Sequence, residues 1–214
     1  MSKENRRRRI ISAAERLFTE KRFHEVKMDD VASFAGVGKG TIYRYFKDKD
    51  DLFLNTIVSG NDELCELLRQ NIKKDSPFIE QLFQLCVQIG GFLARKSRLF
   101  RIMDAEGSRM FRYRKEIRRR LDKHYKEMVS VVAETICKGV DAGEVRRDIP
   151  CEVLALFLLG MLFTLSHKAG MMPASARRYD VIVDIFYNGV CGAKEKGKRQ
   201  VLMKKGVGRI EKAR

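Results

Sequence analysis

Proline, which interrupts helices, is scarce in this chain, with only 3 among its 214 residues. Apolar side chains near its start recur at the spacing of one helical face: Ile10, Ile11, Ala13, Ala14, Leu17 and Phe18. Hydrophobic residues make up 44% of the chain, which is enough to form the core of one or two domains. These features predict an all-α fold class and argue against β-sandwiches and β-barrels.

Helical periodicity and its interruptions predict about nine helices. The expected ranges are residues 5–21, 28–34, 38–46, 49–72, 77–95, 98–104, 107–139, 150–169 and 177–195. A glycine marks the expected break at Glu106-Gly107.

The cysteines are too few and too scattered for a fold that depends on disulfides, and none forms a Cys-x-x-Cys pair. They are Cys65, Cys86, Cys137, Cys151 and Cys191. The start of the chain does not resemble a signal peptide, so we expect a protein of the reducing cytoplasm. The apolar run from Val153 to Leu165 is shorter than the ~20 residues of a membrane span, which predicts a buried helix and no membrane partner.

Basic residues outnumber acidic ones by 44 to 28, which gives a formal net charge of +16. The excess lies at both ends: residues 1–50 carry +5, 51–100 carry 0, 101–150 carry +4 and 151–214 carry +7. Such charge suits a polyanion such as DNA, but a solubilising surface has the same composition. A motif is needed to choose between them.

Two short helices with a glycine-containing turn between them, braced by the longer first helix, form the layout of a helix-turn-helix DNA reader. Gly36 is expected to end the helix at 28–34. In the next helix, Ile42 and Phe46 lie four residues apart and predict a packed face. The residues that we expect at the DNA are Lys27, Lys39, Gly40, Thr41, Tyr43, Arg44, Tyr45 and Lys49.

The segment MDDVASFAGVGKGTIYRYFKDKDDLF, within a match over residues 5–58, resembles the signature of the TetR family of bacterial transcriptional regulators. The resemblance implies a homodimer of all-helical subunits that binds a double-stranded DNA operator. It also implies an N-terminal DNA-binding domain, residues 1–48, and a ligand-binding and dimerisation domain, residues 49–195. Residues 196–214 are expected to be a basic, disordered tail. We expect Lys39, Gly40, Thr41 and Arg44 to approach bases, and the other four DNA-facing residues to hold phosphates.

Three positions depart from the family pattern. Lys27 replaces the usual threonine and cannot cap the second helix, and Gly38 replaces the usual serine. Arg22 replaces a glycine, so we expect the backbone there to differ or to carry strain. Arg6 to Arg9 are expected either to reach an adjacent minor groove or to be a solvated terminus.

The second half of the chain has periodicity but no diagnostic motif. Candidate pocket residues for a small, largely apolar inducer are Phe83, Val87, Phe92, Met103, Phe111, Tyr125 and Met128. Candidate dimer-interface residues are Phe157, Leu158, Met161, Leu165, Ile182 and Phe186. Both sets have the alternative of an ordinary intramolecular core, which needs the same residue types.

Catalysis has little support, because the three histidines are isolated and no nucleophile or phosphate-binding motif is present. We expect no cofactor and no metal site. The sequence therefore predicts a ligand-responsive regulator, most simply a repressor released by a small molecule. The alternatives are a helical enzyme or carrier whose basic ends are incidental, and a nonspecific nucleic-acid binder.

Overall fold

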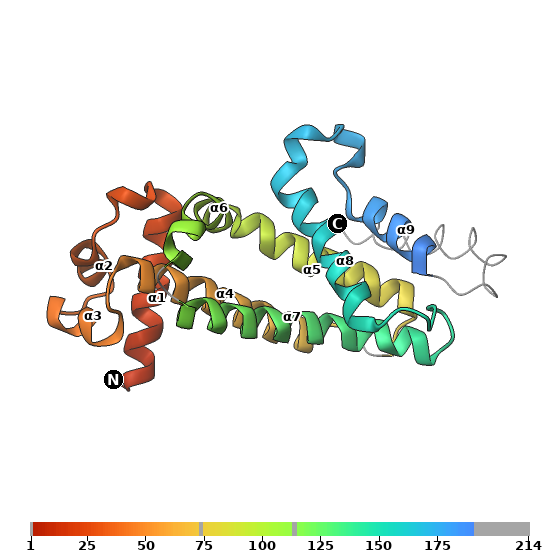
Figure 1. Ribbon diagram of the computed structural model, residues 1–214, viewed down its shortest axis with the longest axis horizontal. Coiled ribbons are helices and arrows are strands. Elements are labelled where there is room, and N and C mark those ends of the chain that lie inside the picture. Colours follow the sequence, from red (N-terminus) through yellow and green to blue (C-terminus); the bar gives the residue numbers. More distant parts are fainter. Residues whose placement is uncertain (1, 73–74, 113–114, 191–214) are drawn as a thin grey trace. The chain divides into compact units, whose positions relative to one another are not determined.

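The computed structural model describes residues 2–72, 75–112 and 115–190, and these residues form helices joined by short turns (Figure 1). The α-helices are α1 (Lys3–Glu20), α2 (Met28–Phe34), α3 (Lys39–Tyr45), α4 (Lys49–Asn71), α5 (Phe78–Arg95), α6 (Ser97–Arg112), α7 (Lys115–Asp141), α8 (Cys151–Lys168) and α9 (Tyr179–Val190). Short 3-10 turns lie at Phe23–Glu25, Ala169–Met171 and Ala174–Ala176. The predicted all-α class is confirmed.

The expected helix break at Glu106-Gly107 is wrong, because α6 continues to Arg112. Gly107 is buried inside this helix, and the described glycines with a positive φ are Gly36 and Gly143. A glycine in a helix often marks close packing rather than an end, and its cost of about 1 kcal/mol can be offset by that packing.

Contacts between residues divide the chain into two compact units. The first unit contains residues 1–64 and 95–126, and the second contains residues 65–94 and those from 127 onward. Both α4 and α7 therefore contribute residues to each unit. The predicted division at residue 48 follows the sequence motif and stays a prediction, and the predicted tail at 196–214 lies outside the described residues.

The core of the first unit joins α1, α2, α3, the start of α4 and α6. Phe18 is fully buried there, with its ring stacked on Phe23 at 5.6 Å and edge-on to Phe53 at 5.1 Å. Leu99 and Met110 of α6 belong to the same cluster. The helix-turn-helix is thus supported by a segment that follows it by about fifty residues in the chain.

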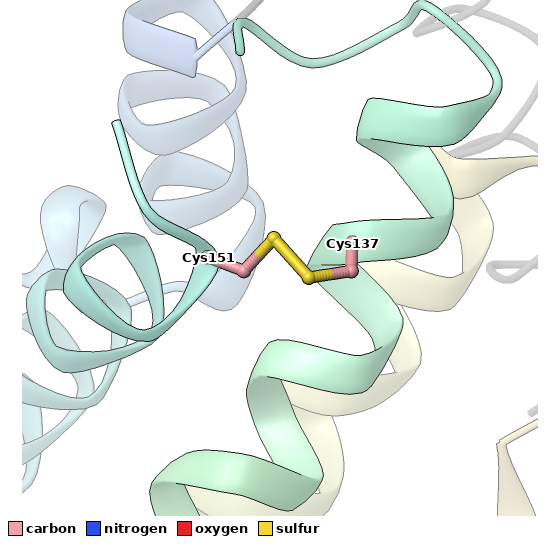
Figure 2. Close-up of a disulfide and its surroundings, with 2 residues drawn as sticks. All are labelled: Cys137 and Cys151. Atoms are coloured by element: carbon pink, nitrogen blue, oxygen red, sulfur yellow. A yellow bond between two sulfur atoms is a disulfide. The ribbon is translucent and has the colours of Figure 1, made fainter. Parts of the chain in front are cut away.

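In the second unit, α8 and α9 pack together, and α9 lies against α5 through a glycine. A side chain at Gly90 of α5 would overlap the ring of Tyr179, the first residue of α9. A disulfide joins Cys137 in the last turns of α7 to Cys151 at the start of α8, with 5.6 Å between their Cα atoms (Figure 2). No sequence motif indicates this pair, because its members lie fourteen residues apart on different helices.

The described helix from Cys151 to Met171 is long and apolar enough to cross a membrane by length and composition, with a mean hydropathy of 1.6. The helical stretch is thus longer than the apolar run on which the sequence-based expectation rested. The same length and composition suit a helix whose exposed apolar side is covered by another protein surface.

Candidate nucleic-acid interface

The turn between α2 and α3 is built from backbone hydrogen bonds that require a glycine. Val37 N–H donates to the Ala32 carbonyl at 2.9 Å, and Gly36 N–H donates to that of Ser33 at 3.0 Å. This pattern ends a helix through a left-handed residue, and Gly36 supplies it with φ of 62°. Arg9 of α1 donates to the Ala35 carbonyl at 2.7 Å, and its guanidinium lies where a side chain at position 36 would be.

Helix α3 has one buried side and one open side, as the sequence predicts. Ile42 and Phe46 are 0% and 1% exposed and pack into the core of the first unit. Lys39, Gly40 and Arg44 are exposed, whereas Thr41 is half-buried. Tyr43 is also exposed. A side chain added at Gly40 would meet no neighbour, so a nucleic-acid surface could approach its backbone closely.

Polar contacts hold several of these side chains before any DNA is bound. Lys39 Nζ donates to Asp29 Oδ2 at 2.8 Å, and this hydrogen bond raises the pKa of Lys39. Arg44 Nη2 donates to Thr41 Oγ1 at 3.4 Å, which brings a cation next to the hydroxyl. Lys27 is exposed and occupies the cap of α2 without a capping side-chain bond, as its residue type predicts.

Tyr45 and Lys49 are directed into the protein more than the sequence pattern predicts. The Tyr45 hydroxyl donates to the Lys3 carbonyl at 3.1 Å and so joins the end of α3 to the start of α1. Lys49 Nζ donates to the Phe23 carbonyl at 2.8 Å and lies 4.6 Å from the centre of the Phe23 ring. Burial lowers the pKa of Lys49. Both residues stabilise the module, and their expected contact with phosphates stays a prediction.

The N-terminal arginines do not form an extended arm within the described residues. Helix α1 begins at Lys3, because Ser2 Oγ accepts the Asn5 N–H at 3.2 Å and caps the helix. Arg8 pairs with Glu4 one turn earlier, at 3.4 Å. Any contact of these arginines with DNA would therefore come from a helix.

The backbone at Arg22 differs from the family pattern without strain. Its φ is −69° and its ψ is 149°, which is extended backbone, and Glu25 Oε2 accepts the Arg22 N–H at 3.0 Å. Described residues other than glycine have no positive φ. The expected change of backbone is present, and the turn is closed by a carboxylate instead of a glycine.

The candidate pocket residues fall in both units, so neither unit alone gathers them. Phe92 and Met128 of the second unit are buried, and Val87 is 38% exposed. Met103 packs on the core of the first unit. Phe83 is half-buried and Tyr125 is 37% exposed, and the side chain of Phe111 lies outside the described residues. The pocket stays a prediction.

The candidate interface residues divide into buried and exposed groups. Leu158, Leu165, Ile182 and Phe186 are at most 8% exposed and already packed within their own chain. Phe157 is 61% exposed and Met161 is half-buried. Three further apolar residues of these helices are exposed: Val153, Leu156 and Ile185. The exposure of Val153 and Leu156 could not be inferred from the pattern of α8, which is apolar on nearly every side.

The family described as bacterial regulatory proteins, tetR family, matches this chain over residues 10–56, the helix-turn-helix segment. The fatty acid metabolism regulator protein of Bacillus subtilis is 22% identical over 173 residues, which cover 81% of this chain and 86% of that protein.

Two solved structures share the fold. A TetR-family transcriptional regulator of Mesorhizobium loti has a TM-score of 0.73 and 23% identity, over 90% of this chain and all of that one. The regulator FadR of Bacillus subtilis, solved in complex with stearoyl-CoA, has a TM-score of 0.64 and 21% identity, over 84% of this chain and 95% of that one.

Proposed function

This chain belongs to the TetR family and is a DNA-binding transcriptional regulator that responds to a ligand, and we propose that this ligand is a long-chain fatty acyl-CoA. The proposal rests on the likeness to a fatty acid metabolism regulator and to a structure that holds stearoyl-CoA. A fatty acyl chain also agrees with the largely apolar inducer expected from the sequence.

The role of the helix-turn-helix in DNA binding is supported by one observation, the exposed side of α3. This helix exposes Lys39, Gly40, Tyr43 and Arg44 beside Thr41, while Ile42 and Phe46 fix its other side in the core. Cationic and hydroxyl-bearing side chains at the start of such a helix suit base edges and phosphates in a major groove.

The acting species is a homodimer in the cytoplasm that represses transcription. The exposed apolar residues of α8 and α9 support a dimer, because Phe157 and Ile185 are 61% and 59% exposed and a second copy would cover them. Two recognition helices then read half-sites about 34 to 36 Å apart, and a ligand that changes this spacing releases the operator. A tenfold loss of affinity needs only ~1.4 kcal/mol of differential binding.

Selection of bound DNA from a random pool tests the DNA-binding half. We expect a palindrome with half-sites separated by about one helical turn, and binding without sequence preference would contradict the proposal. Titration of that complex with stearoyl-CoA tests the ligand. Release of the DNA is expected, and operator DNA should weaken binding of stearoyl-CoA by the same factor.

A further inference from the structure

Two arginines from different helices converge on one neutral oxygen in the first unit. Arg7 of α1 and Arg120 of α7 donate to Oδ1 of Asn55 on α4, at 2.9 Å and 3.0 Å. Asn55 is only 5% exposed, so this oxygen has a fixed position. The three helices are labelled in Figure 1. An amide oxygen carries only a partial charge, so it leaves the charge of the two guanidinium groups uncompensated.

Several other arginines of the described chain are paired with carboxylates. Arg109 bonds to Asp50 through both terminal nitrogens at 3.1 Å, and Arg178 bonds to Asp180 at 2.6 Å. The carboxylate nearest to Asn55 along α4 is Asp51, and each of its oxygens accepts a hydrogen bond from a group other than the two arginines. Asp51 Oδ1 accepts from Asn55 Nδ2 at 2.9 Å, and Asp51 Oδ2 accepts from the backbone of Lys47 at 2.9 Å.

The segment that contains Arg120 is also strongly basic. Residues 95–126 of the first unit contain 13 basic and 4 acidic residues, a net charge of +9, whereas residues 1–64 have a net charge of only +2. Exposed cations of α7 near Arg120 include Lys115, Arg118, Arg119 and Lys123. The largest excess of positive charge in the first unit thus lies outside the helix-turn-helix.

From this convergence we infer that Arg7 and Arg120 form a binding site for a phosphate group, which replaces Asn55 as their shared acceptor. This inference rests on the proposed function, because the phosphate that binds there belongs to the coenzyme A portion of the acyl-CoA. Phosphate oxygens carry full charge and accept several hydrogen bonds, and guanidinium groups match them in a fork-like geometry.

The position of the site gives it a regulatory consequence. Asn55 links α1, which belongs to the DNA-binding module, to α7, which continues into the second unit. A phosphate bound between the arginines would release Asn55 and change how α1 is held on α4. Such a change provides the differential interaction that coupling between ligand and DNA requires.

The first experiment compares two thioesters with the same acyl chain, stearoyl-CoA and stearoyl-pantetheine, which lacks the phosphates. Each is titrated against the wild-type protein bound to its selected operator. We expect stearoyl-CoA to release the DNA at a concentration at least tenfold lower. Equal potency of the two compounds would overturn the phosphate site and leave the proposed ligand class standing.

Arg120→Gln is the test variant, and Arg119→Gln is its control because it removes the same charge from the next residue of α7. We expect the potency ratio of the two thioesters to fall below threefold in Arg120→Gln and to stay at the wild-type value in Arg119→Gln. Operator affinity without ligand should be unchanged in Arg119→Gln, which leaves both bonds to Asn55 in place. A lower operator affinity and a smaller salt slope in Arg120→Gln would instead assign the pair to the DNA backbone and overturn the inference.

Binding of coenzyme A without an acyl chain, measured by calorimetry, tests the phosphate site even if neither thioester releases the DNA. That failure would reject the proposed ligand response, whereas the phosphate site predicts at least tenfold weaker binding of coenzyme A by Arg120→Gln than by the wild type. Equal binding by both proteins, or no binding by the wild type, would overturn the site. Circular dichroism of the variants checks that the fold is retained.

Discussion

Helices α1 and α8 have the same length, 18 residues, but distribute their apolar side chains in different ways. Helix α1 buries one side, including Ile10 and Phe18, and presents charged residues on the other. Helix α8 buries Leu158 and Leu162 within its own chain and still exposes Leu156 and Phe157. The chain alone satisfies the packing of α1, whereas α8 has apolar surface left for a partner.

The largest effect is expected from truncating the buried phenylalanine of α1. Phe18→Ala removes a side chain that is 0% exposed and contacts the rings of Phe23 and Phe53. We expect the free energy of unfolding to fall by about 3–5 kcal/mol, because the cavity cannot close fully. Urea denaturation at a fixed protein concentration measures this. A loss below about 1 kcal/mol would show that α1 is not packed as described.

A somewhat smaller effect is expected from the disulfide that attaches α8 to α7. The bridge between Cys137 and Cys151 closes a loop of fourteen residues, so its loss should lower the free energy of unfolding by ~3 kcal/mol in oxidising buffer. Cys137→Ser tests this by urea denaturation. A reductant should destabilise the wild type and leave the variant unchanged. Equal sensitivity of the two proteins would contradict a bond between these cysteines.

Truncation of the exposed phenylalanine of α8 should affect assembly instead of folding. We expect Phe157→Ala to weaken the proposed homodimer by about 2 kcal/mol, because a large aromatic residue at a protein interface often dominates its affinity. Analytical ultracentrifugation over a range of concentrations measures the dissociation constant. Ser130→Ala, at an exposed position of α7, should leave it unchanged. An unaltered dimer in Phe157→Ala would place the interface elsewhere.

The smallest effect is expected on the open side of α3. Thr41→Ala should cost roughly 1 kcal/mol of operator affinity, concentrated at one base pair, because it removes a single hydroxyl beside Arg44. Binding to operators with single base changes measures this. Lys49→Ala should reduce the salt slope by about one if Lys49 reaches a phosphate, and should also lower stability through its bonds to the turn at Phe23. An unchanged slope with lower stability would leave Lys49 a purely structural role.

The helix-turn-helix was predictable because each of its features is local. The apolar spacing of α1, the left-handed Gly36 and the spacing of Ile42 and Phe46 can each be recognised within a few residues of sequence. The inward direction of Lys49 was not predictable, because its acceptors are carbonyl groups of Phe23 and His24, more than twenty residues earlier.

The rest of the chain was less predictable because its determinants are distant or ambiguous. Gly107 has the residue type of a helix end but is buried inside α6. Arg120 and Asn55 are brought together by the packing of helices that are far apart in sequence. In α8, apolar residues on nearly every side gave no basis for separating the buried Leu158 from the exposed Phe157.

The contact between Gly90 and Tyr179 has a consequence for how this protein can change in evolution. Any larger residue at position 90 meets the tyrosine ring while Tyr179 is present. A smaller residue at position 179 leaves only a cavity, which a later change at position 90 could fill. A substitution at position 179 can therefore precede one at position 90, whereas the reverse order passes through a protein with a steric clash.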